Sequence, residues 1–271
     1  MTASIVISSN AYFEKGNTIM SGHSKWATTK HRKAAQDKKR SALFGKLARV
    51  VFVAAKEGDP NPDNNAALAA AVIKAKSYSL PKDKIDAAIA KASGIGADGA
   101  AWVDVVYEGY GPAGVAVYVD CLTDNRNRTA ADVRAAFTKA GGNLGTDGSV
   151  AFQFERKSEI IVEKAHDFDE DEMMLAVAEA GGEDMEVGEE EVMVMAGPSD
   201  MMIVKKALEE AGYAVIGAEI VMQAINPTAI ETSEAKKVQR LIDRLEELDD
   251  VQVVYHTMDL TDEQLAALDE M

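Results

Sequence analysis

The stretch 159–225 limits the possible fold of this chain more than any other, because strand and helix patterns follow one another there in a fixed order. Short runs rich in valine, isoleucine and methionine alternate with segments whose apolar residues recur at helical spacing. We predict strands at 160–162, 185–187, 192–195 and 214–222, and helices at 171–180 and 200–211. The resulting βαββαβ order is that of a ferredoxin-like domain.

The segments on either side of this stretch predict a second α/β unit. Before it we expect a hairpin, a helix that begins with a capping box, and a further strand, and after it a helix and a strand. The predicted elements are strands at 102–107, 115–122, 150–154 and 251–255 and helices that begin at Thr129 and span 233–248. The first unit would then be inserted into the second. A serial arrangement stays open, because the sequence does not tell which strands pair.

The N-terminal part of the chain predicts helices alone. Leu47 and Val51 belong to an apolar stripe at helical spacing in a first helix, which ends at the proline- and glycine-rich stretch 58–62. An alanine-rich second helix follows at 64–77, and Pro81 opens a third. The predicted fold class is therefore α+β, with an N-terminal three-helix domain and two ferredoxin-like α/β domains, one inserted in the other.

These patterns divide the chain into domains. We predict a basic helical domain at 20–95, a discontinuous α/β domain at 96–156 and 228–271, and an inserted βαββαβ domain at 157–227. Residues 1–19 fit none of them and lack the positive start, long apolar run and cleavage site of a signal peptide. We expect this stretch to be a non-native extension that arose from a misassigned start site, with Met20 as the native start.

Charge is distributed unevenly along the chain. Residues 20–93 carry 15 basic and 6 acidic side chains, a net charge of +9, whereas residues 94–271 carry a net charge of −25 and the whole chain −16. Most of the surface would therefore repel phosphate. Binding of nucleic acid, if it occurs, must be local.

The strongest candidate for such binding is the segment 20–56, the basic arm, which has ten lysines and arginines against one acid, Asp37. Cations of this kind bind phosphate by releasing condensed counterions, and an interleaved aromatic side chain can stack on an unpaired base. The alternative is a charged helix face that pairs with an acidic neighbouring domain. We favour nucleic acid, because surfaces usually avoid clusters of a single sign. The candidate residues are His23, Lys25, Trp26, Lys30, His31, Arg32, Lys33, Lys38, Lys39, Arg40, Lys46 and Arg49.

A second candidate lies at 124–129, between a predicted strand and a predicted helix. Free backbone N–H groups at a helix start favour an anion, and Arg126 and Arg128 could add phosphate contacts. The alternative is a loop whose arginines pair with the many carboxylates of the same domain, and both interpretations stay open. The nearby glycine-rich stretch 141–146 follows a helix and lacks the Lys-Ser/Thr of a phosphate-binding loop, so we expect a helix terminator and turn.

Other functions have little support in the sequence. No pair of carboxylates and no histidine beside a serine or cysteine marks a catalytic site, so we expect no enzyme and no small-molecule substrate. The alternating acids at 167–171 lack the glycine and the final glutamate of a calcium loop, and the 12 methionines suit a core better than a metal. Cys121 alternates with apolar residues and predicts a buried thiol. With one cysteine and no membrane-length apolar run, we expect a cytoplasmic protein without membrane contact.

From Met20 onward the chain resembles the YebC/PmpR family of bacterial regulators. The motifs that carry the resemblance are MSGHSKWATTKHRKAAQDKKR at 20–40, LPKDKIDAAI at 80–89, YEGYGPAGVAVYVDCLTDNRNRT at 107–129 and FTKAGGNLGTDGSVAFQF at 137–154. The resemblance implies a cytoplasmic three-domain protein without cofactor or metal. Two departures are Gly45, which interrupts the first long helix, and the 19 leading residues, which have no counterpart.

The resemblance implies a DNA-binding transcriptional regulator, since the family is generally described in this way. A mitochondrial relative is described as a translational activator, which makes RNA on the ribosome the alternative target. The expected partner is therefore DNA, or ribosomal RNA and the ribosome. Counterion release and cationic contacts serve either polymer.

Overall fold

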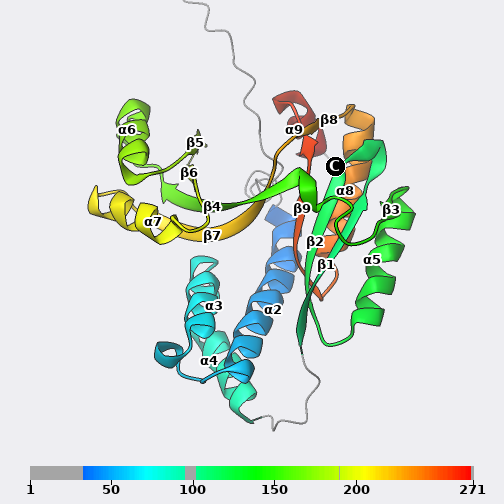
Figure 1. Ribbon diagram of the computed structural model, residues 1–271, viewed down its shortest axis with the longest axis horizontal. Coiled ribbons are helices and arrows are strands. Elements are labelled where there is room, and N and C mark those ends of the chain that lie inside the picture. Colours follow the sequence, from blue (N-terminus) through cyan, green and yellow to red (C-terminus); the bar gives the residue numbers. More distant parts are fainter. Residues whose placement is uncertain (1–32, 95–101, 189, 270–271) are drawn as a thin grey trace, which may run out of the picture.

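The computed structural model describes residues 33–94, 102–188 and 190–269 (Figure 1). The predicted extension at 1–19 and the basic arm up to Arg32 lie outside these ranges. The predicted fold class is confirmed: a three-helix unit precedes two α/β units, and the second α/β unit interrupts the first. In the described part of the chain, no helix has the length and apolar character needed to cross a membrane.

The N-terminal unit consists of α2 (Lys33–Glu57), α3 (Ala66–Ser77) and α4 (Lys82–Gly94), with a short 3₁₀ turn, η1 (Pro62–Asn64), before α3. α2 packs against both other helices, and its Leu47 and Val51 are buried against residues such as Leu68 and Ile85. Asn65 caps α3, because its side-chain oxygen accepts from the N–H of Leu68 at 3.0 Å. Gly45 does not interrupt α2.

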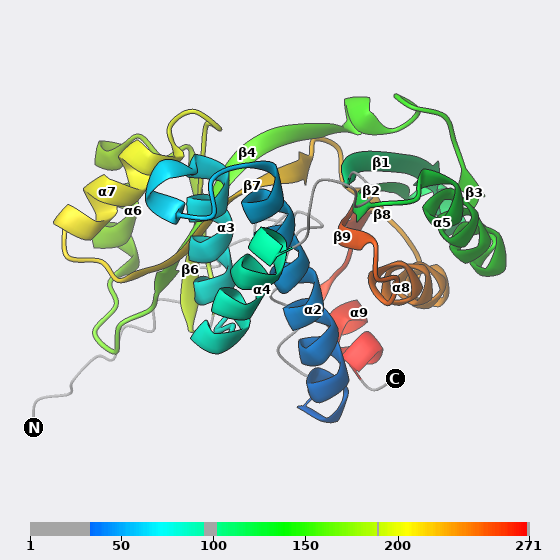
Figure 2. The ribbon, with the colours of Figure 1, turned by 90° about the horizontal axis from the view of Figure 1, so that it is seen from below.

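The first sheet has the order β3-β1-β2-β9 and collects strands from distant parts of the chain. Its members are β1 (Val103–Tyr110), β2 (Ala116–Thr123), β3 (Asn143–Leu144) and β9 (Val251–His256). The predicted hairpin is confirmed, since β1 and β2 pair antiparallel around η2 (Pro112–Gly114). Helices α5 (Arg126–Ala140) and α8 (Thr232–Glu246) lie side by side against this sheet (Figure 2).

The second sheet, β5-β6-β4-β7, is antiparallel throughout and confirms the predicted βαββαβ order. Its elements are β4 (Phe154–Glu163), α6 (Glu170–Ala180), β5 (Asp184–Val187), β6 (Glu191–Ala196), α7 (Met201–Glu210) and β7 (Val215–Ala224). Because β9 follows this unit in sequence yet pairs with β2, the insertion is a property of the strand order itself.

Two predicted element boundaries are wrong. The range 150–154 is not a strand: Val150 precedes a 3₁₀ turn, η3 (Ala151–Gln153), and the strand begins only at Phe154. The helix predicted from Thr129 begins instead at Arg126, because Asn125 is its N-cap. The short strand β3 lies inside the stretch expected to be only a turn.

Three short elements were not predicted from the sequence. They are β8 (Thr228–Ala229) and β10 (Met258–Asp259), which pair in parallel, and α9 (Asp262–Asp269), which packs against α8.

The units pack against one another through side chains of both sheets and of α3. The ring of Tyr118 in the first sheet lies 5.9 Å from that of Phe154, the first residue of β4 in the second sheet, and 6.2 Å from that of Tyr255 on β9 of its own sheet. On β7, the carboxylate of Glu219 accepts from the Tyr78 hydroxyl at 3.0 Å and pairs with Lys74 of α3. The three-helix unit is thus fixed to the inserted unit.

Candidate nucleic-acid interface

The structure describes only part of the predicted basic arm. Lys33, Lys38, Lys39 and Arg40 lie on the first turns of α2. Lys46 and Arg49 follow on the same helix and have described side chains. The remaining candidates, His23, Lys25, Trp26, Lys30, His31 and Arg32, lie outside the described residues.

Lys46 and Arg49 contact the body of the protein. The Lys46 Nζ atom donates to the backbone carbonyl of Glu246, the last residue of α8, at 2.6 Å. The Arg49 guanidinium donates to the carbonyl of Asp249 and lies 5.1 Å from the centre of the Trp102 ring. Carbonyl groups at the end of a helix lack intrahelical partners and carry partial negative charge, so cations stabilise them. These two cations fasten α2 to the end of α8.

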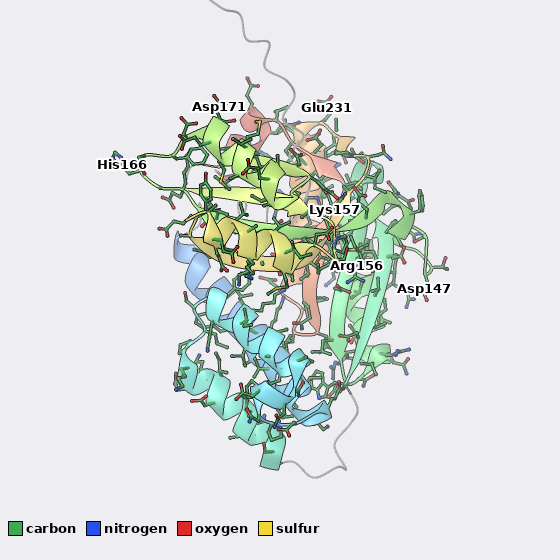
Figure 3. The ribbon with its side chains drawn as sticks, turned by 60° about the vertical axis from the view of Figure 1, so that its left-hand side comes forward. Asp147, Arg156, Lys157, His166, Asp171 and Glu231 are labelled. Carbon is green, nitrogen blue, oxygen red and sulfur yellow. The ribbon has the colours of Figure 1, made fainter. Side chains whose placement is uncertain are left out.

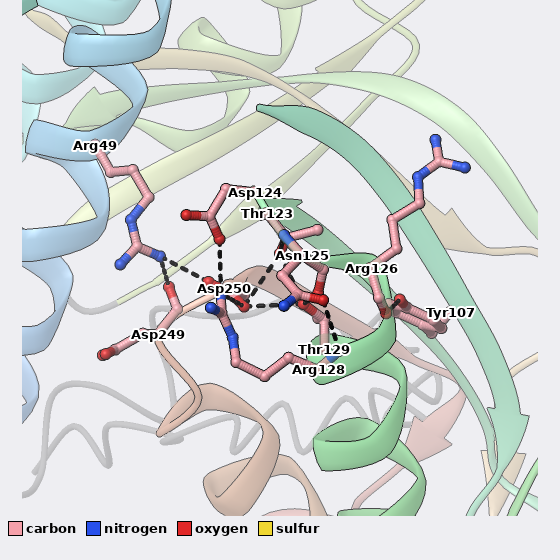
Figure 4. A network of polar contacts seen from close by, with 10 residues as sticks. All are labelled: Arg49, Tyr107, Thr123, Asp124, Asn125, Arg126, Arg128, Thr129, Asp249 and Asp250. Atoms are coloured by element: carbon pink, nitrogen blue, oxygen red, sulfur yellow. Dashed lines mark hydrogen bonds and ion pairs between the residues drawn. The ribbon is translucent and has the colours of Figure 1, made fainter. Parts of the chain in front are cut away.

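The carboxylate of Asp250 lies at the centre of this junction (Figure 4). Its Oδ2 atom accepts from Arg128 at 2.7 Å and from the hydroxyls of Thr129 at 2.9 Å and Thr123 at 3.2 Å. Its Oδ1 atom lies 3.3 Å from Arg49 Nη1. One side chain therefore joins the end of β2, the first turn of α5, the segment before β9, and α2.

The environment of Asp250 favours its ionised form. Burial by itself raises the pKa of this carboxyl, but the hydrogen bonds from Arg128 and Thr129 and the charge of Arg128 outweigh burial and lower the pKa below its ordinary value. The side chain is only 9% exposed, whereas that of Arg128 is 47% exposed. Asp250 is therefore a buried anion held by partly exposed cations.

A cleft of about 570 Å³ opens beside this junction. Five carboxylates and two guanidinium groups contribute to its wall, so it does not have the cationic character that a phosphate needs. Among the residues that the structure describes, no group of three or more histidine, cysteine or acidic side chains could hold a metal ion. The lining residues are Arg49, Trp102, Asp124, Arg128, Thr129, Asp132, Glu247, Leu248, Asp249 and Asp250.

The two arginines predicted near the start of α5 have different surroundings. Arg128 pairs with Asp124 at 3.0 Å as well as with Asp250, so its guanidinium is held by carboxylates of the same domain. The guanidinium of Arg126 points away from this cluster (Figure 4). Only the backbone carbonyl of Arg126 has a contact there, accepting from the Tyr107 hydroxyl at 3.0 Å. Both side chains are exposed, and that of Arg126 is the one that points away from the carboxylates.

Sequence reasoning missed Asp250 and its threonine partners. Asp250 lies 121 positions from Thr129 and 201 from Arg49, so no local spacing connects them. It also missed Glu108, whose buried carboxylate accepts from the N–H groups of Gly148, Val150 and Ala151, each at 2.7 Å. Glu108 lies in the motif at 107–129 that carries the family resemblance, and nothing in the spacing of that motif marks this carboxylate.

Taken together, the fold and the junction define a class of protein: a three-domain α+β chain whose cationic helical unit is fastened to an acidic, split α/β body. Residues 24–95 match the family model described as the TACO1/YebC protein N-terminal domain, and residues 102–258 match the one described as the TACO1/YebC second and third domain. The chain belongs to the TACO1/YebC family, which confirms the resemblance found in the sequence.

Individual relatives cover almost the whole chain. A protein of Bifidobacterium animalis subsp. lactis, named a probable transcriptional regulatory protein, is 48% identical over 251 residues, 93% of this chain and 100% of its own. A protein of the same name from Photobacterium profundum is 50% identical over 246 residues, 90% of this chain and 98% of its own. The crystal structure of a conserved hypothetical protein from Aquifex aeolicus is 42% identical and covers 88% of this chain and 97% of its own, with a TM-score of 0.76. The names of the two bacterial relatives identified by sequence describe regulators.

Proposed function

We propose that this protein is a cytoplasmic nucleic-acid-binding regulator, and that its target is DNA at the genes whose transcription it regulates. The observation that carries the proposal is the separation of charge, +9 over residues 20–93 against −25 over residues 94–271. A polyanion is attracted to the first segment and repelled by the second. The name probable transcriptional regulatory protein, borne by relatives that match almost the full chain, supports DNA as the target.

The contacts at the junction narrow the proposed interface. Lys46 and Arg49 already bind carbonyl groups and a carboxylate of the body. Phosphate would have to replace these partners, so we assign the phosphate contacts to the cations that precede Phe44 in the arm. Arg126 is an additional candidate, since its guanidinium is turned toward solvent (Figure 4).

RNA on the ribosome is the second candidate, and one contact favours it. A helix that reads the major groove of DNA must be free to enter it. Lys74 of α3 and its C-cap residue Tyr78 are bound to Glu219 of β7, which holds the end of the helix against the inserted unit. Binding of a single strand or of an irregular RNA surface by the arm makes no such demand on α3.

The salt dependence of binding tests the arm. Neutralising Lys30, Arg32 and Lys33 together should flatten the plot of log affinity against log salt concentration by about 2.7 for duplex DNA and about 2.1 for a single strand. The matched control neutralises the exposed residues Lys139, Lys206 and Lys237 in the acidic body, and its slope should equal that of the unaltered protein. An unchanged slope in the arm variant would place the phosphate contacts elsewhere.

Crosslinking in cells, followed by sequencing of the recovered nucleic acid, separates the two targets. Recovery of promoter fragments supports the transcriptional regulator. Recovery of ribosomal RNA or transfer RNA supports the translation factor and refutes DNA as the main target. The triple variant Lys30, Arg32, Lys33 serves as the control, because specific crosslinks should be lost with it.

A further inference from the structure

The outer surface of the inserted unit carries large apolar side chains that no other part of the described structure covers. On α6, Met174 is 54% and Leu175 61% exposed, and on α7, Met202 is 62% and Ile203 65% exposed. The core of this unit is complete without them, since it is filled from the opposite sides of the same helices by Met173, Val177, Val204 and Leu208. The four exposed side chains are therefore surplus to folding.

The four side chains come from two neighbouring helices. Helices α6 and α7 pack against each other on one face of the second sheet, and together they form an outer layer of the molecule (Figure 3). Neighbouring packed helices lie about 8–10 Å apart, and a helix of ten residues is about 15 Å long. The outer face of these two helices is large enough to hold a short helix of a partner protein. We call it the α6–α7 surface, made of Met174, Leu175, Met202 and Ile203.

The α6–α7 surface lies in the most acidic part of the protein. Residues 154–224 contain 19 acidic and 5 basic side chains, a net charge of −14. Glu170, Asp171 and Glu172 form the first turn of α6, and Asp171 projects at the edge of the layer (Figure 3). On α7, Lys205 and Lys206 pair with Glu209 and Glu210, so α7 itself has no net charge and the excess of acid comes from α6 and the rest of the unit.

We propose that the α6–α7 surface is a docking site for a cationic amphipathic helix of a partner protein. Leucine-like side chains of the partner would cover the four apolar residues, and its lysines or arginines would face the acids around them. The same charge argues against other occupants. Nucleic acid and anionic membranes are repelled, and a second copy of the chain would bring another net charge of −14 to the interface.

Methionine suits such a surface. Its unbranched, polarizable side chain adapts to partners of different shape, which is why methionine is common at surfaces that bind several helices. The site is distinct from the basic arm, so the proposal stands or fails independently of nucleic-acid binding.

Methionine-methyl NMR of the full chain tests the proposal. The probe is an 18-residue helical peptide with leucines on one side and lysines on the other, and the comparison peptide keeps the lysines but replaces each leucine by glutamine. We expect the first peptide to shift the methyl signals of Met174 and Met202 and to leave that of Met258, buried in the first sheet's core, unchanged. The second peptide should bind at least tenfold more weakly, because it lacks the apolar contacts.

Variants locate the binding site. The double substitution Met174→Gln and Ile203→Gln should weaken binding of the leucine-lysine peptide at least tenfold. The matched control, Ile73→Gln with Phe152→Gln, changes two side chains that are 61% and 70% exposed on other units, and it should change affinity by less than twofold. An unchanged Met258 signal verifies that each variant is folded, and the single substitution Met202→Gln replaces the double one if it is not.

Three results would overturn the proposal. One is equal affinity for the two peptides, since attraction would then come from charge alone. Another is undiminished binding to the double variant. The third is a shift of Met174 and Met202 caused by duplex DNA, or a dimer in sedimentation that the double variant abolishes, because either would assign this surface to a different occupant.

Discussion

Replacing Asp250 by alanine should destabilise the protein by about 3 kcal/mol. The substitution removes an acceptor shared by the buried hydroxyls of Thr123 and Thr129 and by two arginines. A hydrogen bond to a charged group contributes about 1.5–3 kcal/mol when buried, whereas a partly exposed ion pair contributes about 0–1 kcal/mol. The threonines keep part of their bonding, because their hydroxyl oxygens lie 2.8 Å apart and the carbonyl of Asn125, 3.0 Å from the Thr129 hydroxyl, can accept the proton that Asp250 no longer accepts. The loss is therefore smaller than the sum of four contacts.

Trp102 provides the assay, since its ring lies beside Arg49 at the same junction. The chain has two tryptophans, so Trp26→Phe leaves Trp102 as the only reporter of urea unfolding by fluorescence. The matched control is Asp249→Ala: this neighbouring side chain is exposed, and only its backbone carbonyl contacts Arg49. The control should change the free energy of unfolding by less than about 0.5 kcal/mol.

The effect should also depend on pH in a defined direction. Because the folded-state pKa of Asp250 is lowered, its ionised form stabilises the protein fully above the unfolded value of about 3.9, and this stabilisation is lost as the pH falls through the lower folded value. The difference between the unaltered protein and Asp250→Ala should thus stay constant from pH 7 to about pH 5 and shrink below pH 4. A difference no larger than that of the Asp249→Ala control, or one that grows in acid, would refute the reasoning.

Four further predictions concern single side chains. Glu108→Gln should cost about 1–3 kcal/mol and accelerate amide exchange in the 148–151 loop, because an amide cannot accept all three N–H groups; unchanged exchange would contradict the role of the carboxylate. Burial lowers the pKa of His256 to about 4, so stability should fall as the pH drops from about 6.5 to 4 while the unfolded chain gains a proton, and His256→Gln should remove that slope in urea unfolding. Burial raises the pKa of the Cys121 thiol to about 12, so the folded protein has almost no reactive thiolate. A cysteine-alkylating reagent should therefore label Cys121 only as fast as the protein unfolds. Arg126→Gln should flatten the salt dependence of nucleic-acid binding by about 0.7–0.9, whereas Arg128→Gln should mainly lower stability.

The apolar periodicity and the glycine and proline residues between elements were sufficient to predict the order of the main elements, because each helix or strand has its own apolar pattern. The ends of elements were less predictable, since they depend on contacts from elsewhere. Threonine is a preferred residue at helix N-caps, but the hydroxyl of Thr129 donates to Asp250, and Asn125 caps α5 instead. Valine is common in strands, yet the N–H of Val150 donates to the carboxylate of Glu108, and this hydrogen bond holds Val150 in a turn.

Only the cationic half of the candidate site was predictable from the sequence. The run of cations in α2 is visible in the sequence, but the partners of Lys46 and Arg49 are carbonyl groups about 200 positions away. A backbone carbonyl leaves no mark in a sequence, because every residue has one. The same helix face therefore predicts phosphate binding from its composition, while the fold uses part of it to hold two units together.

This division of α2 explains how an acidic body can carry a cationic arm without neutralising it. Arg40 precedes Arg49 by nine residues, about 14 Å along a helix, whereas electrostatic interactions in about 0.1 M salt decay over about 10 Å. The carboxylates around Asp250 therefore act strongly on Arg49 and weakly at the helix position of Arg40. Under the proposed function, a polyanion that approaches α2 would be attracted at the start of the helix and repelled near its junction with α8, so it would be bound at one end and in a restricted orientation. Higher salt weakens the attraction and the repulsion together, so affinity and orientation should be lost over the same range of ionic strength.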